Sequence, residues 1–169
     1  KREAFSWIAC IVVTILLTEF ILNFVIINAN IPSGSMENTI MTNDKLIALR
    51  TSYWFNDPKR GDIIIFKYPD DETEWFIKRV IALPGETVLV KDGKVYINGS
   101  KKALSEPYIK EEPVEDFGPY KVPKNGYFVM GDNRNNSNDA REWETHYVSR
   151  DEVLGKAWFR YYPSIKVIK

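Results

Sequence analysis

The segment Trp75-Phe76-Ile77-Lys78-Arg79-Val80-Ile81-Ala82 predicts a β-strand that is buried on both faces. Because successive side chains of a strand point to opposite faces, Lys78 lies on one face and Arg79 on the other, each among apolar neighbours. A buried charge is costly unless it is paired or neutralised. Arg79 keeps its charge and therefore needs a carboxylate partner. Lys78 can lose its proton, because desolvation lowers the pKa of a lysine, or its long side chain can reach solvent.

Short β-type runs separated by turn residues lie on both sides of this strand, from Asp44 onwards. Besides residues 75–82, the runs are Lys45–Leu49, Asp62–Tyr68, Thr87–Val90, Lys94–Asn98, Gly126–Met130 and Val153–Tyr161. The stretch 105–123 has four prolines and five acidic residues and predicts a loop or a small lid. No part of this region has a long helical period. We therefore expect a mainly β fold, with an all-β domain of antiparallel sheets.

An apolar segment from Phe5 to Ile27 precedes the β region. Its 23 residues would span about 35 Å as a helix, which is enough to cross a hydrocarbon core of about 30 Å. Glu19 and Asn23 oppose insertion, but one central charge costs only about 3 kcal/mol against many apolar residues. The run is longer than the apolar core of a cleaved signal peptide. We expect a single transmembrane signal anchor rather than a cleaved leader or a buried core helix.

The charges that flank this segment predict its orientation. Lys1 and Arg2 precede it, and the next basic residue is Lys45. The positive-inside rule therefore predicts a single-pass protein of the cell membrane with a cytoplasmic stub at residues 1–4. Residues 28–169 would form an extracytoplasmic domain.

Composition excludes several classes of function. The 23 basic and 23 acidic residues cancel, so net charge gives no reason to expect a nucleic-acid partner. Cys10 is the only cysteine, which rules out an intramolecular disulfide and a thiolate metal site. With one histidine, His146, a histidine-based zinc site is also disfavoured. We expect neither a metal nor another cofactor.

The stretch Ile31-Pro32-Ser33-Gly34-Ser35-Met36 is the first candidate for chemistry. A glycine between two serines allows a sharp turn that presents one hydroxyl, but a serine is a poor nucleophile without a base. His146 has no motif around it, and only geometry can decide whether it serves. Lys78 is the other candidate, because a pKa lowered to about 8 leaves about one lysine in ten neutral at pH 7.

A polar loop at residues 131–141 is the third informative segment. Its sequence, GDNRNNSNDAR, follows an apolar strand directly. It lacks the terminal glutamate and flanking helices of an EF-hand calcium site. Arginines and aspartates alternate at spacings suited to internal ion pairs, although a solvated surface loop stays possible. We expect this loop to meet the serine turn and the lysine strand in space.

These three segments, in this order and after an apolar anchor, resemble the sequence boxes of bacterial type I signal peptidases, also called leader peptidases. Residues 60–66 (RGDIIIF), 80–86 (VIALPGE) and 155–159 (GKAWF) are similar to further parts of that family. The resemblance covers nearly the whole chain. It implies a membrane-bound serine endopeptidase that removes N-terminal signal peptides from exported preproteins, cutting after small residues of the Ala-x-Ala type. Its partners would be these signal peptides, membrane lipid and, as a further candidate, the secretion translocase.

Carried over by position, the resemblance assigns roles to single residues. Ser35 would be the nucleophile that forms an acyl-enzyme, and Lys78 its neutral general base. The backbone N–H of Ser35 and the hydroxyl of Ser33 would form the oxyanion hole. Ser137 would hold the lysine amine.

The resemblance also implies supporting roles. Two structural ion pairs would join Arg79 to Asp132 and Asp139 to Arg141. Apolar substrate pockets would lie near Ile31, Met36 and Ile77. Residues 84–125 would form a small accessory β-subdomain. Three positions depart from the usual family pattern and put fine loop geometry in doubt: Asn38, Asn135 and Ala140.

Two other functions stay open from the sequence. A self-cleaving regulator of the SOS repressor kind also uses serine and lysine, but a membrane anchor fits it poorly. An inactive membrane-tethered β-domain could bind exported proteins without cutting them. The joint presence of Ser33, Ser35, Lys78 and Ser137 argues against that alternative.

Overall fold

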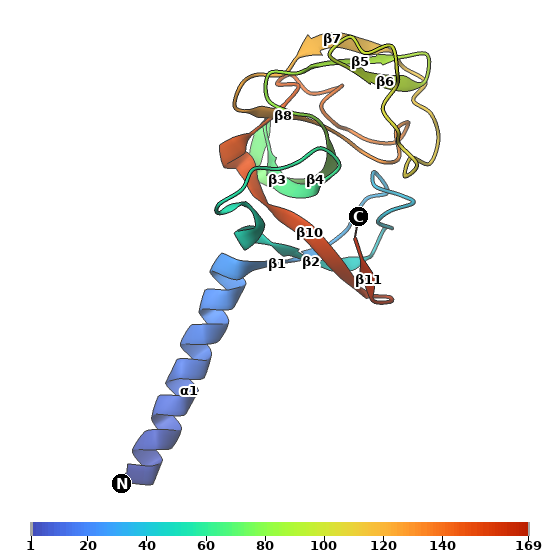
Figure 1. Ribbon diagram of the computed structural model, residues 1–169. Helices are drawn as coiled ribbons and strands as arrows, with labels where there is room; N and C mark the ends of the chain where they lie inside the picture. The colour runs from blue at the N-terminus through green and yellow to red at the C-terminus, as the bar shows by residue number, and fades with distance from the viewer. Residues whose placement is uncertain (1, 169) are drawn as a thin grey trace.

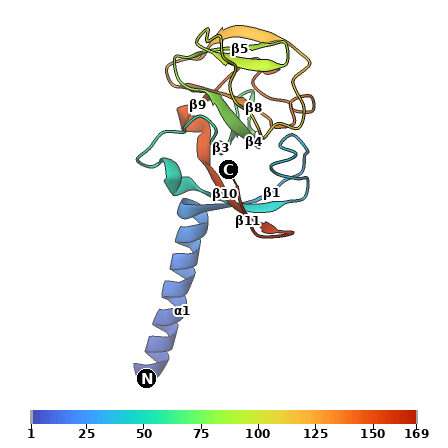
Figure 2. The same ribbon diagram turned by 45° about the vertical axis from the view of Figure 1, so that its right-hand side comes forward.

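A computed structural model of the chain describes residues 2–168 and consists of one long helix that leads into a β domain (Figure 1). Helix α1 spans Arg2–Phe20 and is followed by one π-helical turn, η1, at Ile21–Val25. Figures 1 and 2 show the helix projecting from the β domain as a stalk. Within the described residues, one helical stretch, Ser6–Val25, is long and apolar enough to cross a membrane.

The apolar segment ends earlier as a helix than the sequence predicted. Strand β1 begins at Ile26 and runs to Asn30 (Ile26–Asn30), so the expected anchor limit at Ile27 is wrong by two residues. Ile27 pairs with Ala48 and is 5% exposed in the core of the β domain. A β-branched residue such as isoleucine favours a strand over a further helical turn.

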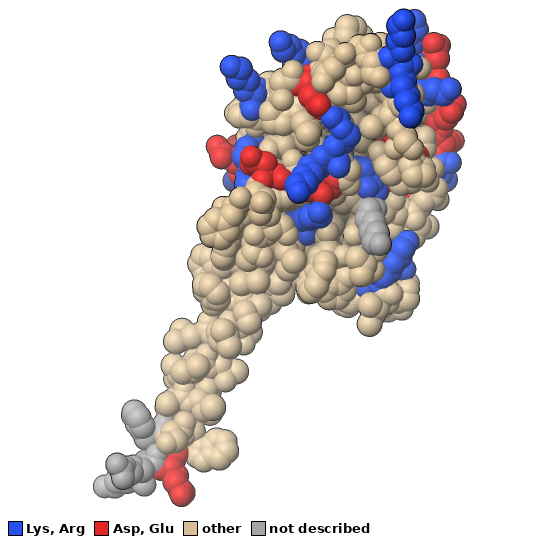
Figure 3. Space-filling model, in the orientation of Figure 1, with Lys and Arg blue, Asp and Glu red and all other residues tan. Residues whose placement is uncertain are grey.

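Figure 3 shows how differently the two parts of the molecule present charge. Acidic and basic side chains are spread over the β domain, whereas the visible stalk is uncharged apart from its N-terminal end. The apolar side chains of the stalk are exposed, for example Leu16 and Phe24. An unburied apolar surface of this extent fits a lipid environment better than water.

The β domain is built on one large sheet in which every pairing is antiparallel. Its strand order is β1-β2-β10-β3-β4-β8-β9, and β11 pairs with β10. These strands are β2 (Lys45–Leu49), β3 (Ile63–Tyr68), β4 (Asp71–Ala82), β8 (Gly126–Met130), β9 (Val148–Ser149), β10 (Val153–Tyr162) and β11 (Lys166–Val167). Two 3-10 turns, η2 (Arg50–Tyr53) and η3 (Arg150–Glu152), connect them. The mainly β, antiparallel architecture predicted from the sequence is confirmed.

A second, three-stranded sheet has the order β6-β5-β7 and lies at the end of the domain farthest from the stalk (Figures 1 and 2). Its strands are β5 (Thr87–Lys91), β6 (Lys94–Ile97) and β7 (Phe117–Lys121), all within the range 84–125 expected for the accessory subdomain. The loop predicted at 105–123 is therefore wrong for residues 117–121. Pro119 is tolerated there because β7 is an edge strand that pairs with β5 alone.

Strand β3 shows why the sequence of a central strand is apolar at successive positions. Ile64 and Phe66 pack into one buried cluster, while Ile63 and Ile65 pack into another. Both faces of the strand are therefore covered. Strand β4 follows β3 directly, with Lys78 paired to Ile64 across the ladder, and this places a lysine in the middle of the core.

Candidate active site

Ser35 and Lys78 meet inside the β domain. Ser35 lies in the turn between β1 and β2, and Lys78 lies on β4. The Nζ atom of Lys78 is 2.8 Å from the Oγ atom of Ser35, which is hydrogen-bonding distance. Ser35 is 6% exposed and Lys78 is 4% exposed, so the lysine does not extend to solvent. A buried amine thus faces a buried hydroxyl.

The surroundings of Lys78 favour its neutral form. Burial lowers the pKa of Lys78 from 10.5 to about 8, although the negative charge of Asp139 acts in the opposite direction. The other close group is the ring of Phe76, whose centroid is 5.2 Å from Nζ. At such a pKa about one molecule in ten carries a neutral amine at pH 7, which is enough for a general base.

Two hydrogen-bond donors accompany the Ser35 hydroxyl on the same turn. The Oγ atom of Ser33 is 3.5 Å from the Oγ atom of Ser35 and is exposed. Within residues 2–168, the backbone N–H of Ser35 donates to no other atom. Both donors are therefore available to a substrate atom near Ser35. Their assignment as an oxyanion hole stays a prediction.

Asn133 holds the serine turn in place, a role that the sequence did not reveal. Its backbone N–H donates to the carbonyl of Ser35 at 3.1 Å, and its side-chain amide donates to the carbonyl of Gly34 at 2.9 Å. Gly131 lets the loop come this close, because a Cβ atom there would lie 2.4 Å from the Ser35 carbonyl oxygen. A glycine at the start of a polar loop was the one available signal for this contact.

The hydrogen bond expected between Ser137 and Lys78 is not formed. The Oγ atom of Ser137 is buried and has no hydrogen-bond partner among residues 2–168. It faces the backbone of the loop instead, since a Cβ atom on Gly131 would lie 2.2 Å from it. The loop geometry thus places this hydroxyl in the core of the site without engaging it.

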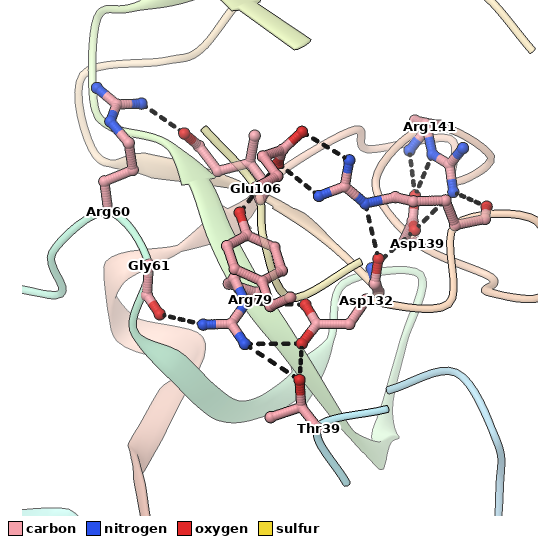
Figure 4. A network of polar contacts seen from close by, with 12 residues as sticks. Thr39, Arg60, Gly61, Arg79, Glu106, Asp132, Asp139 and Arg141 are labelled. Carbon is pink, nitrogen blue, oxygen red and sulfur yellow. Dashed lines mark hydrogen bonds and ion pairs between the residues drawn. The ribbon is translucent and has the colours of Figure 1, made fainter. Parts of the chain in front are cut away.

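Arg79 has the carboxylate partner that its burial requires (Figure 4). Its Nε and Nη2 atoms donate to Asp132 at 2.8 and 2.7 Å, and its Nη1 atom donates to the carbonyl of Gly61 at 2.8 Å. The ring of Tyr108 covers the guanidinium, with 3.9 Å from its centroid to Cζ. The Thr39 hydroxyl donates to the same carboxylate. The predicted Arg79–Asp132 pair is confirmed.

The second predicted pair is also present. Arg141 donates to both carboxylate oxygens of Asp139, each at 2.9 Å, and the Gly131 N–H donates to Asp139 at 2.9 Å. The sequence missed a third pair, in which Arg134 donates to Glu106 at 2.6 Å. The contacts of Asp139 stay within the loop, as Figure 4 shows for Arg141, whereas the pair of Arg134 and Glu106 joins the loop to another segment.

A cavity of about 530 Å³ opens next to the two reactive side chains. One wall is formed by residues 31–35, the opposite wall by residues 74–78, and Asn136 and Asn138 contribute the remainder. Ile31 and Ile77 line it as expected. Met36 does not line it, which corrects the prediction. Its side chain is fully buried and packs in the apolar cluster that contains Leu46.

His146 does not approach this site. Its Nδ1 atom is 2.8 Å from the carbonyl of Ala140, and its ring packs against Phe117 and Tyr120. Among residues 2–168 it has no contact with Ser35, so a serine–histidine arrangement is not supported.

Comparison with known proteins gives one consistent family. Residues 4–162 match the family model described as signal peptidase, peptidase S26. The chain is 44% identical over 161 residues to a probable signal peptidase I-2 of Synechocystis, covering 92% of this chain and 72% of that protein. It is 35% identical to signal peptidase I of Bacillus licheniformis, covering 100% of this chain and 94% of that protein.

A solved structure agrees with the sequence relatives. The chain is similar to the crystal structure of a signal peptidase I from Enterococcus faecalis, with 36% identity and a TM-score of 0.52. The match covers 60% of this chain and 97% of the other. Since the family model spans nearly the whole sequence and relatives match along most of their own length, the chain belongs to the signal peptidase family, peptidase S26.

Proposed function

We propose that this peptidase removes signal peptides from exported preproteins with Ser35 as nucleophile and Lys78 as general base. The observation that carries the proposal is the 2.8 Å separation of Nζ and Oγ, with both side chains buried. A neutral amine at this distance can take the hydroxyl proton as Oγ attacks a peptide carbonyl. Depressed lysine pKa values in a cavity are typical of functional sites.

Ser35, Lys78 and one water molecule are sufficient for the complete reaction. Attack by Oγ gives a tetrahedral intermediate, whose oxyanion would accept hydrogen bonds from the Ser35 N–H and the Ser33 hydroxyl. Its collapse breaks the peptide bond, and the ammonium of Lys78 gives its proton to the leaving amine. The signal peptide is then an ester of Ser35. Neutral Lys78 then takes a proton from water, whose oxygen attacks the ester carbonyl. The bond to Oγ breaks, the signal peptide leaves with a free carboxyl group, and the ammonium of Lys78 returns the proton to Oγ.

The edge of β4 offers a place for an extended substrate. Strand β8 pairs with β4 only from Arg79 to Ala82, so on that side no strand of the described chain pairs with residues 74–78. An added peptide strand could therefore fill the space between this edge and residues 31–35. The apolar walls at Ile31 and Ile77 suit small side chains before the cleaved bond, in line with cleavage of the Ala-x-Ala type.

The stalk supports a location at the membrane. Helix α1 passes through η1 into β1 with no linker, so the β domain sits directly at the end of the apolar helix. Ser35 lies only a few residues beyond β1. With Lys1 and Arg2 on the cytoplasmic side, the site would face the outer membrane surface, where the cleavage sites of translocated preproteins emerge. A contact with the secretion translocase is a further prediction.

The test is preprotein processing by the full chain in detergent micelles. Ser35→Ala and Lys78→Ala should each lower the rate at least about a thousandfold, because a nucleophile and its base act as a unit. Lys67→Ala, an exposed lysine on the neighbouring strand, is the matched control and should process normally. Circular dichroism should show the same fold in all variants. Near-normal processing by either site variant would rule out the dyad.

A further inference from the structure

Glu74 lines the cavity that contains Lys78 and lies four residues before it on β4. Phe76 and Lys78 share a face of the strand, and Glu74 follows where the ladder between β3 and β4 becomes irregular. Exposure rises from the buried Lys78 through the half-buried Phe76 to the exposed Glu74. The cavity therefore leads from the reactive amine outward to a carboxylate.

Glu74 differs from the three acidic residues that precede it. Asp70 accepts backbone N–H groups from residues 144 and 145, Asp71 accepts hydrogen bonds from Thr73, and Glu72 pairs with Lys67 at 3.1 Å. Glu74 has no hydrogen bond or ion pair with any side chain among residues 2–168. Its carboxylate is thus free to bind a group that comes from outside the chain.

The charge of the cavity points to the chemistry of that group. Glu74 and Lys78 are the only ionisable side chains among the residues that line it. When Lys78 is neutral, as the reaction requires, Glu74 is the one charged group among the described residues that line the cavity. The ring of Phe76 also lines the cavity and can attract a cation.

We propose that Glu74 forms a subsite for a lysine or arginine side chain of the substrate, four residues from the cleaved bond. This inference rests on the proposed function, because it takes the bond to be cleaved beside Ser35. An extended peptide rises by about 3.3 Å per residue, so a residue four positions away lies opposite Glu74 when the scissile residue lies at Lys78. The subsite would add charge selectivity to the apolar selection nearer the bond.

The experiment compares peptide substrates that differ at one position. A peptide with a signal-peptide cleavage site is made neutral on both sides of the bond, and one lysine is then moved along it from six residues before to six residues after. Values of kcat/KM are measured with the full chain at low salt. We expect a preference of about three- to fivefold for lysine at the position four residues from the bond on one side. The preference should shrink at 0.5 M salt, as screening requires (about 4 Å Debye length).

Three variants assign the preference to one carboxylate. With Glu74→Gln, the lysine and neutral peptides should have equal values of kcat/KM. With Glu74→Lys, the value should be highest for a peptide with glutamate at the same position. Glu72→Gln is the matched control, because Glu72 is on the same strand but outside the cavity, and the preference should stay.

The outcomes separate this inference from the proposed function. Cleavage of all peptides without a charge preference, or a preference that survives in Glu74→Gln, would overturn the subsite alone. A wild-type protein that cleaves none of the peptides would overturn the proposed function and the subsite with it. A preference only at positions other than the fourth would overturn the register along β4.

Discussion

Lys78 and Arg79 are neighbours on β4, and they show two opposite ways to bury a cation. Both are almost fully buried, at 4% and 2% exposed. Arg79 has two hydrogen bonds to Asp132, one to the Gly61 carbonyl and the Tyr108 ring above it. Lys78 has the Ser35 hydroxyl, with no carboxylate in contact among residues 2–168. One cation keeps its charge and builds structure, whereas the other becomes easy to deprotonate and is suited to chemistry.

The ion pair of Arg79 also helps to position Ser35. Asp132, the partner of Arg79, accepts a hydrogen bond from Thr39, which follows the serine turn in sequence. The next residue, Asn133, binds the carbonyls of Gly34 and Ser35. The pair formed by Arg79 and Asp132 therefore fixes the loop that positions the nucleophile. A substitution of Arg79 should therefore disturb the position of Ser35 through this loop.

Removal of each cation in turn should have opposite effects on the stability of the fold. Arg79→Met leaves the Asp132 carboxylate buried without its partner and should lower the free energy of unfolding by about 3–5 kcal/mol. Lys78→Met removes a charge that has no acidic partner, so at pH 7 its stability should equal or exceed that of the wild type. Urea unfolding followed by tryptophan fluorescence measures both.

A double variant serves as the control for this prediction. Replacing Asp132 by leucine in the Arg79→Met background removes the stranded carboxylate and should recover part of the lost stability. Equal destabilisation by Arg79→Met and Lys78→Met would show that the two cations do not differ in the way proposed.

The second prediction concerns the rate as a function of pH. Because the pKa of Lys78 is lowered to about 8, the value of kcat/KM should rise about tenfold per pH unit up to about pH 7.5 and level off above pH 8.5. At pH 7 it should be about a tenth of its plateau. A flat profile between pH 6 and 9 would contradict a lysine base.

The same lowered pKa has a consequence for stability. Between about pH 8 and the ordinary lysine value of 10.5, the unfolded chain carries a proton on Lys78 that the folded chain lacks. The contribution of this group to the free energy of unfolding must therefore rise with pH in this window and be constant below it. The wild type minus Lys78→Met difference isolates it. A difference that falls as pH rises would show that the native state stabilises the ammonium.

Sequence patterns predicted most strands and the main ion pairs, for physical reasons that are visible in single residues. Strand β2 has the predicted limits, Lys45–Leu49. The Arg79–Asp132 pair followed from the cost of a buried guanidinium and was assigned by the family resemblance. Glu106 could not be chosen as the partner of Arg134, because charge alone does not select one of 23 acidic residues.

The wrong predictions, for the start of β1 and for Met36, share a different cause. The first two residues of β1, Ile26 and Ile27, belong to a continuous apolar run in which neither a period of 2 nor one of 3.6 is visible, so their pairing with β2 decides their structure. The family resemblance placed Met36 near the substrate pockets, but adjacent residues of a turn can point in different directions. Its burial depends on packing with distant residues such as Leu46, which are brought together only by the fold.

The smallest predicted effect concerns Ser137, whose hydroxyl is buried near the site without a partner among residues 2–168. An ammonium has three donors, and the Ser35 hydroxyl can accept only one hydrogen bond from Lys78. If Ser137 receives a second bond when Lys78 takes up the proton, Ser137→Ala should lower kcat a fewfold and move the midpoint of the pH profile below 8. The free energy of unfolding should change by less than about 0.5 kcal/mol, because no hydrogen bond of the resting structure is lost. An unchanged rate and midpoint would leave Ser137 without a role in catalysis, and a large loss of stability would make it a structural residue on the Arg79 side of the comparison.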